Sequence, residues 1–423
     1  MRLHRPISWI VLLLLPAMIT AQERLSLDQA INEALKGNPD IIATRYEIEA
    51  AEGRIAQAGR IPNPEIEFSW GEMPSLFKFG EAGERDIGIV QSIEFPTKRG
   101  HRIDVASLEK RLVELKLERT RVLVASSTKR AYIDLLLSKA NLASLRAQRL
   151  LLGDFLEVAN SRLRTGAGTY LDVIRAKVEM TRVGNELVEA ERQTSYDRSQ
   201  LNLLMGREGT VSIEPSDSLN AQYVQADTSI HNLTANSRYL KMVQLTVEKN
   251  QSSLSLARSS YLPDFSLGVS HQYRTGEPPF DANNFAGETG SGVGVQLGVS
   301  VPIWFWQEPA GQVQEASALL QTTETRATVV ERKIRASINE SLNAFRSAFA
   351  QVRSFEATLL EDARDILNTG IDQYRSNQID VLNLLDVYRT HRAAQAEYNR
   401  AVANLARAIA DLEAAVELPN EEL

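Results

Sequence analysis

The sequence contains no cysteine and only five histidines. Without cysteine the chain cannot form disulfides, thiolate metal sites or a lipid-modified cysteine. None of the histidines pairs with carboxylates at the spacing of a metal site; they are His4, His101, His231, His271 and His391. A nucleotide-binding loop is also missing, because Gly292, Gly294 and Gly298 lie in a strand pattern and not before a helix. We therefore expect no catalytic residues, no cofactor, no metal site and no enzyme.

The chain also lacks a strong excess of charge of one sign. Its 47 Lys and Arg and 54 Asp and Glu give a formal net charge of -7, which leaves no electrostatic footprint for nucleic acid. Beyond the N-terminus there is no apolar run of about 20 residues, the length that a transmembrane helix needs. The 423 residues are enough for roughly two or three domains.

Residues 1–21 have the pattern of a secretory signal peptide. Arg2 and Arg5 precede an apolar run over residues 7–19, and the small residues Thr20 and Ala21 follow it. This order predicts cleavage after Ala21. The alternative is a membrane anchor, but about 13 apolar residues broken by a proline are too few to span a bilayer. The rest of the chain is then expected either to be soluble outside the cytoplasm or to enter a membrane as β-structure.

The remaining sequence reads as two similar halves. Three pairs of segments resemble each other in the same order, each pair about 200 residues apart. The pairs are AGRIPNPEIEFSWG with ARSSYLPDFSLGVS, SIEFPTKRGHRIDVA with GVSVPIWFWQEPAGQVQEA, and RLRTGAGTYLDVIRA with QYRSNQIDVLNLLDV. These collinear matches predict two structural repeats, residues 22–212 and 213–423.

Each half contains long stretches that favour uninterrupted helix. Residues 101–152, 312–369 and 371–418 contain neither glycine nor proline. In the first of these stretches apolar residues recur at steps of three and four, as in a coiled-coil seam. Helices of this length, about 70 to 85 Å, must pack along one another.

Each half also contains one predicted β-hairpin, at residues 64–96 and 263–302. In both hairpins apolar residues alternate with small or polar ones, as in Phe265, Leu267 and Val269 against Ser266 and Gly268. Segments of about 10 residues with this alternation are typical of membrane β-barrels, in which the apolar side faces lipid. Aromatic residues near the strand ends fit such a barrel; they are Trp70, Tyr273, Phe280, Phe285, Trp304 and Trp306. The alternative is a half-buried hairpin in a soluble α+β domain.

Four strands are too few to close a membrane barrel, which needs about eight or more. Open sheet edges are not tolerated in lipid. If the strands are in a membrane, several copies of the chain must therefore build the barrel together.

The stretch RLRTGAGTYLDVIRA predicts a helix end followed by a new helix. Gly166 and Gly168 supply a helix stop, since glycine best accepts the left-handed backbone found there. Thr169 can cap the helix that follows. In the second half Asn377 takes the place of Gly166, so the chain is expected to make the same turn twice.

These features together resemble the TolC-type outer-membrane efflux proteins. The resemblance rests on the signal peptide, the two copies of helix, hairpin and long helices, RIPNPEIEFSW and SYLPDFSLGVS before the first strands, and the RLRTG and QYRSN breaks. The segment IEFPTKRGHR is similar to members that serve heavy-metal resistance pumps for cobalt, zinc, cadmium or copper.

The resemblance implies a mixed α and β fold and a homotrimer in the outer membrane. Four strands from each chain would make a 12-stranded barrel, in contact with lipid, and the long helices would continue it as a coiled-coil tunnel across the periplasm. The partners would be a periplasmic adaptor and an inner-membrane pump of the resistance-nodulation-division type. The protein would be a passive export duct for substrates such as heavy-metal cations. The same duct could instead serve drug efflux or type I protein secretion, and a soluble periplasmic coiled-coil scaffold is a further alternative.

The resemblance also implies roles for the two helix turns. The adaptor-docking tips would be Arg164, Thr165, Gly166, Ala167, Gly168, Thr169, Arg375, Ser376, Asn377 and Gln378. The periplasmic gate would involve Asp172, Asn383 and Asp386. Members commonly carry two acidic residues after the second tip, but one of those positions is Asn383 here, and a basic position of some members is Ile379. For Asp172 and Asp386 the alternative is an acid near a helix N-terminus, which the helix dipole favours.

Overall fold

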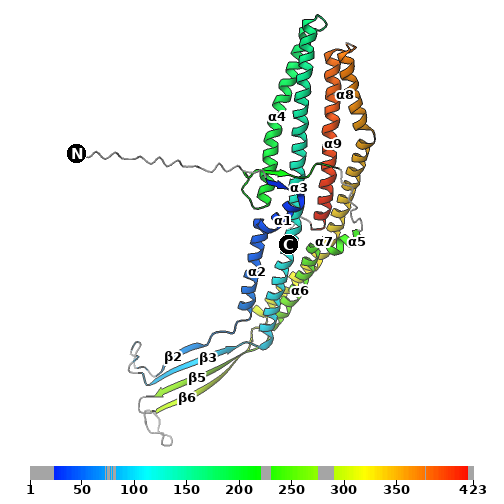
Figure 1. The fold of residues 1–423 in the computed structure, drawn as a ribbon. Helices are drawn as coiled ribbons and strands as arrows, with labels where there is room; N and C mark the ends of the chain where they lie inside the picture. The colour runs from blue at the N-terminus through cyan, green and yellow to red at the C-terminus, as the bar shows by residue number, and fades with distance from the viewer. Residues whose placement is uncertain are drawn as a thin grey trace, which may run out of the picture. The chain divides into compact units, whose positions relative to one another are not determined.

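The computed structural model describes residues 23–71, 73, 77, 79, 82–220, 230–274, 290–376 and 378–417. The elements in chain order are β1 (Glu23–Leu25), α1 (Leu27–Gly37), α2 (Pro39–Ala58), β2 (Glu65–Gly71), β3 (Glu84–Ile93), α3 (Pro96–Arg164), α4 (Tyr170–Leu204), β4 (Ile213–Pro215), α5 (Ile230–Asn236), α6 (Arg238–Ser259), β5 (Asp264–Arg274), β6 (Gly290–Ser300), α7 (Glu308–Ser354), the π-helical turn η2 (Phe355–Leu359), α8 (Leu360–Arg375) and α9 (Val381–Ala415) (Figure 1). The predicted mixture of long helices and a few strands is confirmed. The predicted signal peptide, Phe280, Phe285 and Asn377 lie outside the described residues.

The chain divides into two compact units. The tip unit comprises Met1–Ala34, Ser127–Gln222 and Gln351–Arg407, and it contains the turns between α3 and α4 and between α8 and α9. The sheet unit comprises Leu35–Ser126, Tyr223–Ala350 and Ala408–Leu423. Each unit draws on both halves of the sequence.

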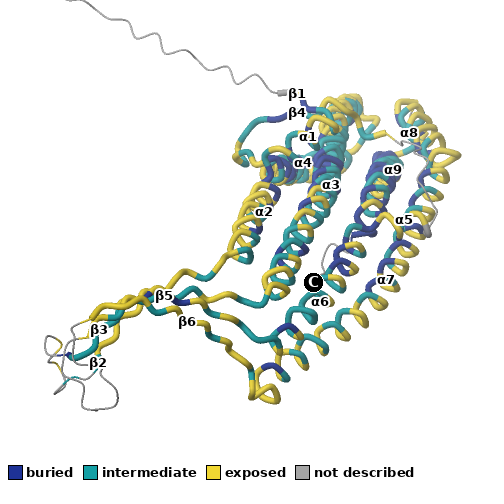
Figure 2. Tube along the Cα trace, turned by 90° about the horizontal axis from the view of Figure 1, so that it is seen from below, coloured by how far each residue is buried: buried dark blue, intermediate teal, exposed yellow. Residues whose placement is uncertain are grey.

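The sheet unit contains a four-stranded antiparallel sheet in the order β2-β3-β5-β6. Its strands lie within the hairpin ranges that the sequence predicts. One row across the sheet joins Ile66, Ile89, Val269 and Val295, and each of these side chains is more than half exposed. The next row, on the opposite face because side chains alternate, joins Glu67, Gly88, Ser270 and Gly294. The sheet therefore has one apolar and one small or polar face, and most of the strand residues are exposed (Figure 2).

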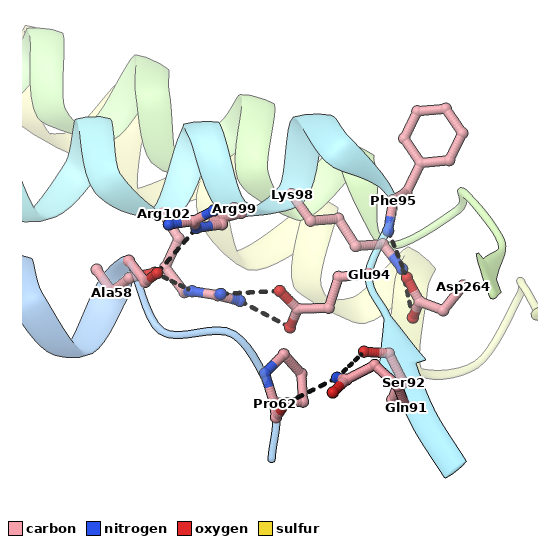
Figure 3. A network of polar contacts seen from close by, with 11 residues as sticks. Ala58, Pro62, Gln91, Ser92, Glu94, Phe95, Lys98, Arg99, Arg102 and Asp264 are labelled. Atoms are coloured by element: carbon pink, nitrogen blue, oxygen red, sulfur yellow. Dashed lines mark hydrogen bonds and ion pairs between the residues drawn. The ribbon is translucent and has the colours of Figure 1, made fainter. Parts of the chain in front are cut away.

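Several polar residues lie on the apolar face of the sheet, among them Gln91 and His271. Gln91 lies between Ile89 and Ile93 on β3 and shares their face. Its side-chain amide donates to the carbonyls of Pro62, at 2.8 Å, and Ser92, at 2.7 Å (Figure 3). These bonds satisfy both amide hydrogens, which lowers the cost of a polar group on an apolar face.

The start of α3 is joined to the end of the sheet by ion pairs (Figure 3). Arg102 makes a two-pronged contact with Glu94, at 2.9 and 2.8 Å, and also donates to the Ala58 carbonyl at the end of α2. The Lys98 ammonium contacts both carboxylate oxygens of Asp264, at 2.8 and 2.9 Å. The hydrogen bond from Arg102 lowers the pKa of Glu94. The PTKRGHR segment thus fixes the direction in which α3 leaves the sheet.

The last described residue, Glu417, is bonded to the start of α6. Glu417 is buried, and its carboxylate accepts hydrogen bonds from the backbone amides of Arg238 and Tyr239 at the start of α6. It caps α6 because the first amides of a helix have no partner within the helix. The apolar cluster around this contact includes Tyr239, Ile334, Leu412 and further residues of α6, α7 and the end of the chain.

Candidate functional site: the two hairpin tips

The first tip, between α3 and α4, ends α3 with a Schellman turn. The amide of Ala167 donates to the Arg162 carbonyl, at 2.9 Å, and the amide of Gly166 donates to the Leu163 carbonyl, at 3.2 Å. Gly166 has φ of 75°, in the left-handed region that glycine accepts without steric cost. A larger residue at Gly168 would be crowded, since a Cβ there would lie 3.0 Å from the Arg162 Cβ. The helix stop that the sequence predicts is present.

Helix α4 begins with a capping box. The Thr169 hydroxyl accepts from the amide of Asp172, at 3.3 Å, and the Asp172 carboxylate accepts from the amide of Thr169, at 3.0 Å. This reciprocal pair satisfies two of the amides that a helix start leaves without partners. Thr169 is the predicted cap. One carboxylate oxygen of Asp172, a predicted gate residue, is therefore used in holding the tip itself.

The second tip, between α8 and α9, has a cap that the sequence reasoning missed. The Asp380 carboxylate accepts from the amide of Asn383, at 2.9 Å, three residues into the helix. Before it, the amide of Gln378 donates to the Gln373 carbonyl, at 2.8 Å, and the Ser376 hydroxyl donates to the Asp372 carbonyl, at 2.8 Å. An aspartate directly before an apolar-periodic stretch is the signal that would have identified Asp380.

The Arg162 side chain reaches from the first tip to the last turn before the second tip. The Arg162 guanidinium lies 4.6 Å from the centre of the Tyr374 ring and donates to the Tyr374 carbonyl, at 3.2 Å. It also donates to the Ala167 carbonyl at its own tip, at 3.4 Å. Tyr374 is buried, and the loss of solvent raises the pKa of its hydroxyl. The first tip is thereby connected to the last turn of α8.

An apolar cluster lies next to these turns. Phe155 and Tyr388 meet edge to face, with ring centres 6.3 Å apart, and are among the buried residues of the cluster. The others are Leu152, Val183, Tyr374, Val381, Leu384 and Leu385. All four tip helices contribute, so the two hairpins share one small core. Burial raises the pKa of the Tyr388 hydroxyl.

Two ion pairs connect α4 with α9. Arg389 donates to Glu179, at 2.7 Å, and Arg392 donates to Glu186. The Glu179 side chain is only 3 % exposed, whereas Arg389 is 47 % exposed. The glutamates and arginines are about two hundred positions apart, so no sequence spacing could have predicted these pairs.

The predicted gate residues occupy two separate elements. Asp172 lies in the first turn of α4, while Asn383 and Asp386 are exposed on α9. Residues three apart on a helix lie on the same face, so Asn383 and Asp386 point the same way. Among the residues that the structure describes, no three His, Asp or Glu side chains gather into a group that could hold a metal ion.

The family model described as "Outer membrane efflux protein" matches residues 30–207 and 229–416. The chain belongs to this family. It is therefore an outer-membrane efflux protein and, as predicted, not an enzyme, and the predicted location in the outer membrane is confirmed.

Curated relatives cover almost the whole of this outer membrane efflux protein. It is 22% identical over 378 residues to the cobalt-zinc-cadmium resistance protein CzcC of Cupriavidus metallidurans, covering 88% of this chain and 85% of the relative. It is 20% identical over 405 residues to the outer membrane protein TolC of Vibrio cholerae, covering 92% and 91%.

A solved structure shares the fold. The outer membrane channel CmeC of Campylobacter jejuni superposes with a TM-score of 0.76 at 14% identity, covering 92% of this chain and 85% of that one. Among the helices of the described residues, none is long and apolar enough to cross a membrane.

Proposed function

We propose that three copies of this outer membrane efflux protein form an export duct, with residues 22–212 and 213–423 as its two repeats in each chain. Each copy contributes the four strands of its sheet to a closed 12-stranded barrel in the outer membrane. The helices of the tip unit continue the duct into the periplasm. There the tips bind a periplasmic adaptor that is joined to an inner-membrane pump.

The observation that carries this proposal is the four-stranded sheet. Its apolar face is exposed, and within the described residues β2 and β6 each pair with only one other strand. In lipid, unpaired backbone amides and carbonyls are costly, so β6 of one copy is expected to pair with β2 of the next. The two matches of one family model along the chain support the two repeats.

Heavy-metal cations are the substrate class that we propose. The support is the likeness to CzcC, which is named for cobalt, zinc and cadmium resistance, over most of both chains. The pump would be of the resistance-nodulation-division type and would supply the energy, since the duct itself is passive. Asp172, Asn383 and Asp386 would lie at the periplasmic entrance.

Membrane insertion and trimer formation can be tested with a matched pair of variants. Leu297 is on the apolar face of β6 and Gln296 is on the opposite face. Leu297→Lys should prevent recovery of a detergent-extracted trimer from outer membranes, because a charge facing lipid costs about 2–4 kcal/mol at the bilayer midplane. Gln296→Lys should leave the trimer intact. A wild-type protein recovered in the detergent-free periplasmic fraction would contradict the duct and favour a soluble scaffold.

The substrate is tested separately in a strain that lacks the gene. Loss of the protein should lower tolerance to zinc, cobalt, cadmium or copper, and the wild-type gene should restore it. If metal tolerance is unchanged and drug sensitivity rises, the substrates are drugs and not metal cations. If metal tolerance is unchanged and a secreted protein is lost, the substrate is that protein. The proposed duct stands in either case.

A further inference from the structure

The helical chain that leads to the second tip contains one irregular turn. At Phe355–Leu359 the backbone forms a π-helical turn, and the amide of Leu360 donates to the Phe355 carbonyl five residues back. An α-helix makes this bond four residues back. The helix that leads to the first tip, α3, has no such turn over its 69 residues. Single π-turns within α-helices are rare and frequently lie at functional sites.

The π-turn accommodates one extra residue in an otherwise regular pattern. The buried or partly buried residues of this stretch include Val352, Phe355, Leu360, Ala363, Gly370 and Tyr374. The steps between them are those of an α-helix, three, four or seven residues, with the exception of the step of five from Phe355 to Leu360. That step coincides with the π-turn, so α8 keeps the same side toward α9 after the irregular bond.

Bending at this turn would disturb little packing. None of the five residues is buried, and Glu356 to Leu359 are all exposed. The contacts with α9 at this level include a hydrogen bond from the Tyr398 hydroxyl to Glu356, at 3.1 Å, and a ring contact of 6.5 Å between Phe355 and Tyr398. Both contacts are made by side chains, which can follow a small displacement of the backbone at the π-turn.

Helix α8, which follows the π-turn, is packed more closely on α9. A Cβ at Gly370 would lie 2.9 Å from the Cγ1 of Val387, so the two helices approach closely there. Nearer the π-turn, the Nδ1 of His391 lies 3.1 Å from the Ala363 carbonyl. Helices α8 and α9 run side by side toward the tip (Figure 1). A bend at the π-turn would therefore move α8 and α9 together.

We propose that the π-turn Phe355–Leu359 is a joint at which α8, with the second tip, changes direction during export. Sharp bends in helices occur at such turns because the regular bond pattern is already broken. The joint's role in export rests on the proposed function, whereas its existence as a weak point of the helix does not.

Deleting Ala357 removes the joint without moving the inward face. The step from Phe355 to Leu360 becomes four residues, as in a regular α-helix, and Ala363, Gly370 and Tyr374 keep their side. Deleting the exposed Asp365 is the matched control, because it rotates Gly370 and Tyr374 away from α9 and should destabilise the tip. Ala357→Ser controls for the changed residue at constant length.

Amide hydrogen exchange of the full-length protein in detergent tests the joint directly. In the wild type, amides 356–361 should exchange at least about tenfold faster than those of 363–374, and the Ala357 deletion should remove this difference. The deletion variant should also form normal amounts of protein and export less than the wild type. Equal exchange of the two segments in the wild type, or wild-type export by the deletion variant, would overturn the proposal. If the wild type itself exports nothing, the proposed function fails and the exchange data alone decide whether the joint exists.

Discussion

The guanidinium of Arg162 lies over the ring of Tyr374, at 4.6 Å, and donates to the carbonyl of the same residue. The Arg162 carbonyl meanwhile accepts the amides of Ala167 and Gly168 that close the first tip. One residue thus closes its own turn through its backbone and reaches the second hairpin through its side chain.

Arg162→Ala should weaken the connection between the tips. A cation–π contact contributes about 0.5–2 kcal/mol, and the hydrogen bond to the carbonyl adds to it. We expect faster proteolysis at both tips and an unchanged yield of protein. Arg164→Ala, two residues away and exposed, is the control. Equal cleavage rates of the two variants would show that the Arg162 contact does not hold the tips.

Gly166→Val and Gly168→Val should each impair export while the trimer and barrel remain intact. A β-branched residue at Gly166 must adopt φ of 75°, which costs about 1–2 kcal/mol, and any Cβ at Gly168 presses on Arg162. Gly166→Asn is the control, because asparagine accepts this backbone conformation. Wild-type export by both valine variants would mean that the tip shape has no part in docking.

Asp172 can be tested for its two roles, as a helix cap and as a charge at the gate. Asp172→Ala removes the carboxylate that accepts from the Thr169 amide in the capping box and should lower the stability of the tip by about 1 kcal/mol. Asp172→Asn removes the charge and keeps an oxygen that can accept from the Thr169 amide. If the charge matters at the entrance, single-channel conductance changes in the asparagine variant although thermal unfolding does not. Identical conductance of that variant and the wild type would leave Asp172 with the cap alone.

Gly370 should tolerate no larger residue while Val387 is present. Gly370→Ala places a methyl group 2.9 Å from the Val387 Cγ1 and should destabilise the α8–α9 pair by about 1–3 kcal/mol. Val387→Ala in the same chain should recover much of this loss. A double-mutant cycle on thermal unfolding checks the coupling, and simple additivity of the two changes would contradict the predicted contact.

The Glu94–Arg102 pair should make the stability of the sheet unit depend on pH. Arg102 lowers the pKa of Glu94 in the folded chain, so the pair stabilises the folded state fully above the unfolded pKa of glutamate, about 4.3. That stabilisation is lost as the pH falls below this value toward the folded pKa. Glu94→Gln should therefore unfold more readily than the wild type at neutral pH, and the difference should shrink in acid. A constant difference from pH 7 to pH 3 would exclude the pair as its source.

Local features of this protein follow from the sequence because their causes lie within a few residues. Gly166 ends α3 and Thr169 begins α4 through bonds that span three to five residues. The alternation of Phe265, Leu267 and Val269 fixes which side chains share a face, since the period of a strand is two. The Asp380 cap is also a local feature, and it could have been predicted from the position of Asp380 directly before Val381.

Only the tertiary structure decided which distant segments meet. The pairing of β3 with β5, the contact of Arg162 with Tyr374 and the ion pair of Arg389 with the buried Glu179 all join residues more than 170 positions apart. Such contacts depend on how whole elements pack, which no local pattern encodes. The π-turn Phe355–Leu359 belongs with these features, because its stretch of sequence contains no glycine or proline and favours a regular helix.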